Sequence, residues 1–92
     1  MRKFYTYMLA NRHHAAIYIG VTSDLARRVS EHKQGLASRF TKRYGINNLV
    51  YFEQFFNPDK AIQRETSLKR WRRAWKINLI EDQNPDWCEL KP

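Results

Sequence analysis

The sequence predicts a small α+β domain in which strands and helices follow one another in the order ββαβαα. Two segments rich in aromatic and β-branched residues flank a short polar loop near the N-terminus, as in an antiparallel hairpin. A third such segment lies in mid-chain, and capping residues with apolar residues at helical spacing mark the helices. The sheet should therefore be small, largely antiparallel and covered by helices.

The hairpin strands are expected at residues 4–10 and 15–22, with residues 11–14 as the loop. In a hairpin closed by that loop, residues whose numbers sum to 25 face each other. Tyr7 and Tyr18 should therefore be cross-strand neighbours on one face of the sheet.

A helix is expected over residues 23–34, because capping side chains precede Leu25 and Gly35 follows the last turn. Leu25, Val29 and His32 then share its inner face. Residues 35–47 should form an ordered basic loop or a short turn of helix.

The second half of the chain should contain a strand at 48–56 and two helices. Asn57 can cap the first helix, Pro58 fits its first turn, and the predicted range is 58–75. The second helix is expected at 76–83, ending at Asn84-Pro85. The apolar stripe of the longer helix, with both tryptophans pointing inward, comprises Ala61, Leu68, Trp71 and Trp75.

Charge is the strongest compositional signal. The 92 residues include 17 Lys and Arg against 9 Asp and Glu, a net charge of +8. A single basic domain of this kind favours polyanions, with nucleic acid first and an anionic membrane surface second; a merely solvated cationic surface is the alternative. No apolar run is long enough for a transmembrane helix, and the N-terminus does not resemble a signal peptide.

Cysteine and histidine usage excludes two kinds of cross-link. The single cysteine, Cys88, cannot form an internal disulfide, which favours a reducing, cytoplasmic compartment. Next to Trp87 it is expected to be a buried thiol. With one Cys and three His, the chain offers no zinc ligand set.

Several side chains could carry chemistry, and each has a structural alternative. Paired phenols can move protons but more often belong to a core or sheet surface. Arg28 and His32 lie four residues apart and could meet a phosphate, or could be a solvated arginine and a capping histidine. Glu65, on the shoulder of the apolar stripe, needs a partner: a cation such as Arg64 or Lys69, or a divalent metal ion.

Four further cations are candidates for phosphate contacts. Helical spacing turns Arg70 and Arg73 outward together, and Lys42 and Arg43 lie in the basic loop.

The ordered set of these features resembles the GIY-YIG nuclease domain, and most closely its small stand-alone bacterial members. The likeness covers residues 4–90. The segments that carry it are Tyr18-Ile19-Gly20-Val21-Thr22-Ser23-Asp24-Leu25, Phe40-Thr41-Lys42-Arg43-Tyr44, Leu49-Val50-Tyr51-Phe52-Glu53, Arg64-Glu65 and Asn84-Pro85-Asp86-Trp87.

The resemblance implies a three-stranded antiparallel sheet flanked by helices, and metal-dependent cleavage of DNA in a structure-related or repair role. Matched position by position, it assigns the motif tyrosines to Tyr7 and Tyr18, the phosphate-side arginine to Arg28, the metal ligand to Glu65, a supporting polar residue to Asn84, and a histidine of less settled role to His32. The first triplet departs from the pattern, because Tyr5-Thr6-Tyr7 keeps the tyrosine and lacks the glycine.

Two functions follow as hypotheses for a single domain spanning residues 1–92. The first is a Mg²⁺- or Mn²⁺-dependent endonuclease in which Tyr7 or Tyr18 deprotonates the attacking water. The second is a non-catalytic nucleic-acid-binding protein; a membrane-surface or scaffold protein is a weaker third. DNA is the expected partner and RNA a possible one. Many members of that family carry a separate DNA-binding module; none is expected in these 92 residues, so a protein partner for targeting is a further expectation.

Overall fold

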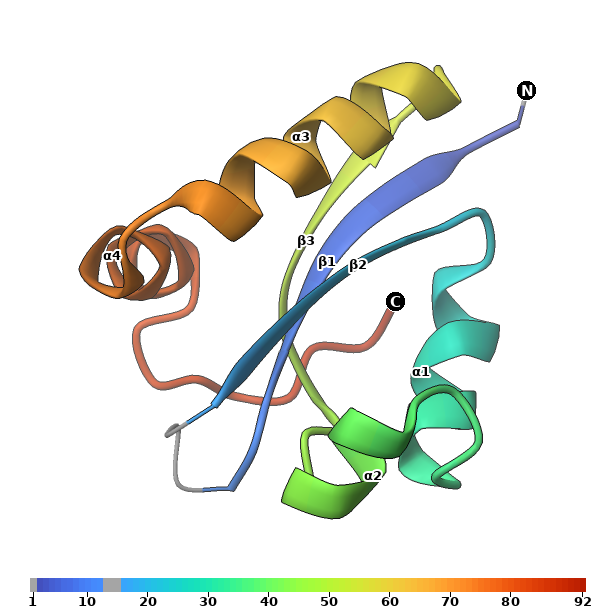
Figure 1. Cartoon of the computed structure of the whole chain (residues 1–92). Helices are drawn as coiled ribbons and strands as arrows, with labels where there is room; N and C mark the ends of the chain where they lie inside the picture. The colour runs from blue at the N-terminus through green and yellow to red at the C-terminus, as the bar shows by residue number, and fades with distance from the viewer. Residues whose placement is uncertain (1, 13–15) are drawn as a thin grey trace.

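The structure, a computed structural model, describes residues 2–12 and 16–92 and confirms the predicted order of elements. Strands β1 (Phe4–Ala10), β2 (Ile17–Thr22) and β3 (Asn48–Phe55) form an antiparallel sheet in the order β2-β1-β3 (Figure 1). The helices of the described chain are α1 (Leu25–Lys33), α2 (Arg39–Tyr44), α3 (Pro58–Arg70) and α4 (Arg73–Gln83). The short helix α2 occupies the segment for which a basic loop or helical turn was expected.

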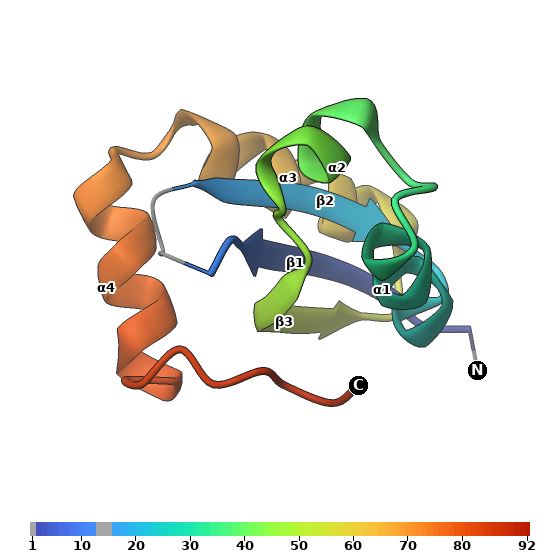
Figure 2. The ribbon, with the colours of Figure 1, turned by 90° about the horizontal axis from the view of Figure 1, so that it is seen from below.

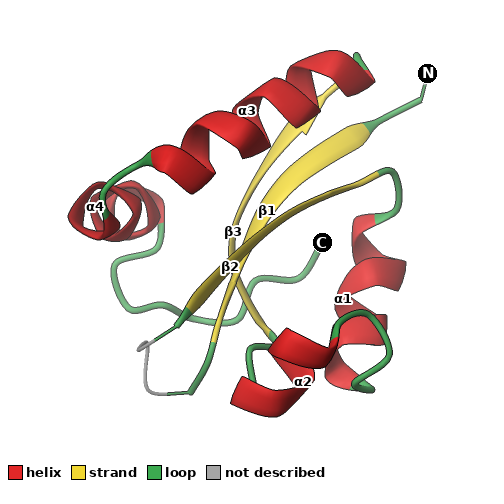
Figure 3. Cartoon of the chain, in the orientation of Figure 1, coloured by secondary structure: helices red, strands yellow, loops and turns green. Residues whose placement is uncertain are grey.

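Helices cover both faces of the sheet. Helices α3 and α4 lie on one side, and α1 and α2 lie on the other (Figures 2 and 3). Among the described residues, none of the helices has the length and apolar character needed to cross a membrane.

The central strand β1 contributes to two separate cores, because successive side chains of a strand point to opposite faces. Met8 packs with Leu68 of α3 and Ile80 of α4. Tyr7 packs on the opposite side with Leu25 and Val29 of α1. Both cores are therefore built outward from the same strand.

The hairpin register differs from the predicted one. Tyr7 faces Gly20 and Tyr18 faces Leu9, so paired residue numbers sum to 27 rather than 25. Each residue of β1 therefore pairs with a residue of β2 two positions further along the chain than predicted. Next to the loop, the Asn11 N–H donates to the Ala16 carbonyl at 3.3 Å. The expected loop at 11–14 lies partly outside the described residues. Tyr7 and Tyr18 still share one face, but as diagonal neighbours.

Gly20 is required by this register. The Tyr7 ring lies across it, and a Cβ at position 20 would sit 2.5 Å from the Tyr7 hydroxyl oxygen. Any larger residue would displace the ring. The glycine of the Tyr18-Ile19-Gly20 triplet thus makes room for the first tyrosine.

Capping residues set the helix limits largely as predicted. The Asp24 side chain accepts the Arg27 N–H at 3.2 Å and starts α1, which ends two residues before Gly35. Asn57 caps α3, and Pro58 occupies its first turn. Helix α2 begins with Ser38 as its N-cap and ends at Gly45.

The prediction of one helix over residues 58–75 was wrong, because the chain breaks at Trp71 and Arg72. Both residues are extended, with ψ of 149° and 148°. Trp71 packs partly into the core, beneath the Arg64 guanidinium at 5.1 Å from its ring. The break re-aims the next helix, so Trp75 is 50% exposed instead of buried.

The prediction of a buried thiol was also wrong: Cys88 is exposed. Trp87 has a positive φ of 55° and its side chain enters the core. This turn leaves the neighbouring cysteine outside. The tail then runs beside β3, where the Leu90 N–H donates to the Leu49 carbonyl at 2.8 Å (Figure 2).

We expect Gly20→Ala to lower the free energy of unfolding by about 1–3 kcal/mol, because the new methyl group overlaps the Tyr7 ring. Urea denaturation followed by circular dichroism measures the change. The control is the same substitution in a Tyr7→Leu background, where the ring is gone and the cost should shrink. An equal loss of stability in both backgrounds would show that overlap with the Tyr7 ring is not its cause.

Candidate active site

Three aromatic side chains from different elements meet on the α1 side of the sheet. Tyr7 of β1 and Tyr18 of β2 have ring centroids 6.4 Å apart. The His32 ring of α1 lies 5.9 Å from the Tyr7 ring and 5.3 Å from the Tyr18 ring. Tyr7 is almost fully buried, whereas Tyr18 is half-buried.

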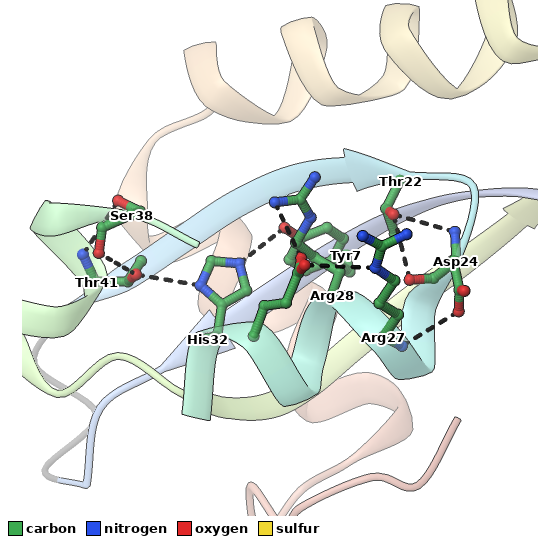
Figure 4. Close-up of polar contacts among 9 residues, drawn as sticks. Tyr7, Thr22, Asp24, Arg27, Arg28, His32, Ser38 and Thr41 are labelled. Carbon is green, nitrogen blue, oxygen red and sulfur yellow. Dashed lines mark hydrogen bonds and ion pairs between the residues drawn. The ribbon is translucent and has the colours of Figure 1, made fainter. Parts of the chain in front are cut away.

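His32 joins Tyr7 to helix α2 by hydrogen bonds at both ring nitrogens. Its Nε2 lies 3.0 Å from the Tyr7 Oη, and its Nδ1 lies 3.1 Å from the Thr41 Oγ1. The Thr41 hydroxyl donates in turn to the Ser38 carbonyl at 3.1 Å. Figure 4 shows this series of hydrogen bonds running from the sheet through α1 to α2. His32 is therefore neither a solvent-exposed residue nor a helix cap.

Burial shifts the two titrating partners in opposite directions. It raises the pKa of the Tyr7 phenol, an effect increased by Tyr18 and by the carboxylates of Glu65 and Glu31 and opposed by Arg28. Burial and the nearby Arg28 charge lower the pKa of His32 from its ordinary 6.5. At neutral pH the pair is thus an uncharged phenol bonded to an uncharged imidazole.

Arg28 reaches this cluster from the exposed side of α1. Its charge acts on both Tyr7 and His32, while its side chain is 40% exposed and its Nη1 lies 3.5 Å from the Glu31 carboxylate. A solvent-exposed pair of this kind contributes little, so an arriving phosphate can compete for the guanidinium. The adjacent polar pocket, about 230 Å³, is lined by Thr22, Ser23, Asp24, Arg27, Arg28 and Glu31.

Glu65 is not held by the internal arginine that was one of its expected partners. Arg64 instead forms a bidentate pair with Glu53 of β3, with N–O distances of 2.9 to 3.1 Å. Glu65 instead pairs with the half-exposed Lys69 of its own helix, whose Nζ lies 3.6 Å from its carboxylate. The Glu65 side chain is 20% exposed and close enough to raise the pKa of Tyr7.

Two contacts fix α3 so that Glu65 keeps this position. The Thr6 hydroxyl, on the strand position next to Tyr7, donates to the Ala61 carbonyl at 2.7 Å. The Arg64–Glu53 pair holds the same helix to β3, where the Tyr51 hydroxyl also donates to Glu53. Arg64 and Glu65 are thereby directed to different partners.

A metal ion at Glu65 would have few ligands from the protein. Within residues 2–12 and 16–92, no group of three or more His, Cys, Asp or Glu side chains could enclose a metal ion. A hard cation such as Mg²⁺ is commonly held by one or two carboxylates, with water and substrate phosphates completing its shell. The half-buried Glu65 carboxylate suits that mode.

The other predicted residues lie elsewhere. The Asn84 amide donates to the carbonyls of Val50 and Cys88, and its oxygen accepts the Cys88 N–H, so it ties the end of α4 to β3 and the tail. Arg70 ends α3 and Arg73 begins α4; both are exposed, on either side of the break.

Helix α2 presents cations and aromatic rings outward. Lys42 and Arg43 are exposed, and the Arg43 guanidinium lies 5.5 Å from the Tyr44 ring centroid. Phe40 and Tyr44 are both about half exposed, with ring centroids 5.0 Å apart.

Thr41 is the site residue that the sequence interpretation missed. It is 2% exposed and contacts His32 from the inner side of α2. The spacing Ser38-x-x-Thr41, with an N-cap serine three residues before it, was the available signal. Nothing in the sequence alone indicated that the threonine would meet a histidine of another helix.

Comparison with known proteins identifies the family. Residues 3–78 match the family model of the GIY-YIG catalytic domain. A UPF0213 protein of Clostridium perfringens is 34% identical over 80 residues, covering 87% of this chain and 85% of that protein. A UPF0213 protein of Natronomonas pharaonis is 36% identical over 67 residues, covering 73% and 79% respectively.

A solved structure shows the same fold. The solution NMR structure of the UPF0213 protein BH0048 from Bacillus halodurans matches with a TM-score of 0.59 and 26% identity, over 92% of this chain and 89% of that one. The family match spans most of the chain. The chain therefore belongs to the GIY-YIG family.

Proposed function

We propose that this protein is a Mg²⁺- or Mn²⁺-dependent endonuclease that hydrolyses phosphodiester bonds in DNA. The observation that carries the proposal is the buried Tyr7–His32 hydrogen bond, with Arg28 and Glu65 close enough to act on the pKa of Tyr7. Perturbed titratable groups gathered in this way are typical of catalytic sites.

Tyr7 and His32 act together as the proton acceptor. The raised pKa of the phenol opposes a free phenolate. Tyr7 can still take the proton of the attacking water if it passes its own proton to Nε2 of the neutral His32, 3.0 Å away. The negative charge then never rests on the buried phenol. Tyr18, more exposed and beside both rings, lines the position of that water.

Arg28 and Glu65 act on the phosphate. Arg28 offsets the charge that develops on the phosphoryl oxygens. Glu65 is the residue that would hold Mg²⁺ or Mn²⁺, which when bound polarises the scissile phosphate and stabilises the leaving oxygen. A metal ion bound there would displace the Lys69 ammonium from its ion pair with Glu65.

The surface supports a polyanionic substrate. The net charge of +8 supplies attraction without sequence selectivity. Lys42 and Arg43 of α2 directly follow the buried Thr41, so the same short helix that contacts His32 also carries two exposed cations. Arg70 and Arg73 provide further phosphate contacts near the α3–α4 break.

The alternative is a nucleic-acid-binding protein without catalysis. The altered first triplet, Tyr5-Thr6-Tyr7, favours it, and the net charge fits it equally well. It predicts binding without strand scission under any divalent metal.

Glu65→Gln should lower Mg²⁺-dependent nicking of supercoiled plasmid by about 100-fold or more, because the metal loses its protein ligand. Glu89→Gln is the matched control, since it removes an exposed carboxylate of the C-terminal tail. Cleavage that survives in Glu65→Gln, or that persists in EDTA, would remove the mechanism. Wild-type binding to the plasmid with no cleavage would favour the alternative.

The acid limb of the rate profile should lie below pH 6.5. His32 must be neutral to accept the proton, and its pKa is lowered by burial and by Arg28, so activity should be lost only as pH falls through that lowered pKa. The check is kcat/KM against pH at saturating metal, with DNA binding by Glu65→Gln followed over the same range. An acid limb above 6.5 that binding does not explain would contradict this role.

Replacing both Lys42 and Arg43 by glutamine should weaken duplex DNA binding. The slope of log K against log salt should fall by about 0.9 for each phosphate that the variant no longer neutralises. Fluorescence anisotropy with Glu65→Gln as the parent protein measures the slope without cleavage. Lys91→Gln, which removes an exposed charge from the tail, is the control. An unchanged slope would place the DNA elsewhere.

A further inference from the structure

We propose that Thr41 is a positioning residue that fixes the tautomer of His32, with the proton on Nδ1 and with Nε2 free to accept the Tyr7 hydroxyl proton. This inference deepens the proposed function and rests on it for its catalytic consequence. The tautomer itself can be tested without any activity.

The tautomer of His32 follows from a count of the protons in the hydrogen bonds that link Tyr7 to Ser38. The Thr41 hydroxyl has a single proton, and the Ser38 carbonyl receives it at 3.1 Å. The Thr41 oxygen is then an acceptor toward Nδ1 at 3.1 Å, which places the imidazole proton on Nδ1. Nε2 is left with a lone pair that accepts the Tyr7 O–H at 3.0 Å. Three donors thus meet three acceptors.

The opposite tautomer leaves one donor without a partner. If Nε2 carried the proton, it would donate to the Tyr7 oxygen, and the Tyr7 O–H would need another acceptor. In the described part of the chain, His32 Nε2 is the hydrogen-bond partner of that hydroxyl, and Tyr7 is only 2% exposed. A buried hydroxyl without a partner is costly, so the Nδ1–H tautomer is favoured.

Helix α2 holds the Thr41 hydroxyl in this orientation. The Thr41 N–H donates to the Ser38 Oγ at 3.3 Å, which fixes the first turn. At the other end, the Ile46 N–H donates to the Thr41 carbonyl at 2.9 Å, and the fully buried Ile46 side chain anchors the exit of the helix. These bonds fix the Thr41 backbone, and the bond of its hydroxyl to the Ser38 carbonyl fixes the side chain toward His32.

For catalysis, the tautomer decides whether His32 can accept a proton from Tyr7. Nε2 can accept the proton from Tyr7 only if it is bare, and the imidazolium that forms keeps its Nδ1–H bond to Thr41. Thr41 is not expected to touch the DNA or the metal. It acts through His32, as outer residues act on metal-ligating or catalytic histidines.

The first test is NMR of the ¹⁵N-labelled full chain at pH 7.5, without metal or DNA. Long-range ¹H–¹⁵N correlation distinguishes protonated from bare ring nitrogens, and a His32→Gln spectrum assigns the His32 signals among the three histidines. We expect bare Nε2 and protonated Nδ1 in the wild type and in Thr41→Ser. Protonated Nε2 in the wild type would overturn the inference, and this measurement needs no variant to fold other than the assignment control.

Thr41→Val is the sharper variant, because it keeps the shape of the side chain and removes the acceptor of Nδ1–H. We expect its His32 to shift toward the Nε2–H tautomer and its kcat to fall by about 10–100-fold with KM unchanged. Thr41→Ser should restore both the tautomer and kcat. A Thr41→Val protein that keeps the Nδ1–H tautomer, or that cleaves like the wild type, contradicts the inference.

The two proposals fail separately. A wild type with the expected tautomer that cleaves no DNA refutes the nuclease and leaves the tautomer assignment standing. A wild type that cleaves DNA with its His32 proton on Nε2 refutes the role of Thr41 and leaves the nuclease standing.

Discussion

The burial of β1 on both faces is the constraint on which the rest of the structure depends. A strand in that position directs alternate side chains into two cores, so neighbouring residues fix elements on opposite sides of the sheet. Thr6 holds the α3 backbone at Ala61, and with it the helix that carries Glu65. Tyr7 holds His32 of α1. One dipeptide of the central strand therefore sets the relative positions of the two helices that contribute to the site.

This geometry has a steric and an electrostatic condition. The Tyr7 ring fits only because Gly20 has no side chain beneath it. The same burial raises the pKa of Tyr7 and lowers that of His32, which keeps both groups neutral until a proton moves between them. Because Arg64 pairs with Glu53, its guanidinium does not neutralise Glu65, the carboxylate proposed to hold a metal ion.

The sequence was sufficient for features that are set locally or by alternation: the three strands, the cap at Asn57 followed by Pro58, a small antiparallel sheet and the shared face of the tyrosines. The resemblance to the family added that the sheet has three strands. It was insufficient where tertiary contacts decide. The hairpin register depends on where the loop closes, and the break after α3 depends on how Trp71 packs under Arg64. The meeting of His32 with Thr41 joins two helices. The metal, the DNA substrate, the repair-related role and the cytoplasmic location stay predictions.

The polar chain from Tyr7 to Ser38 is itself an argument for function. An apolar core of the same shape would need no matched donors and acceptors, and a partly satisfied buried network costs stability. In a protein that only binds nucleic acid through surface cations, such a network would serve to specify the core and nothing more. A proton relay needs both groups held away from water in one protonation state. Since every donor along this network has an acceptor, it holds Tyr7 and His32 in one arrangement, which is the arrangement that the proposed acid–base role requires.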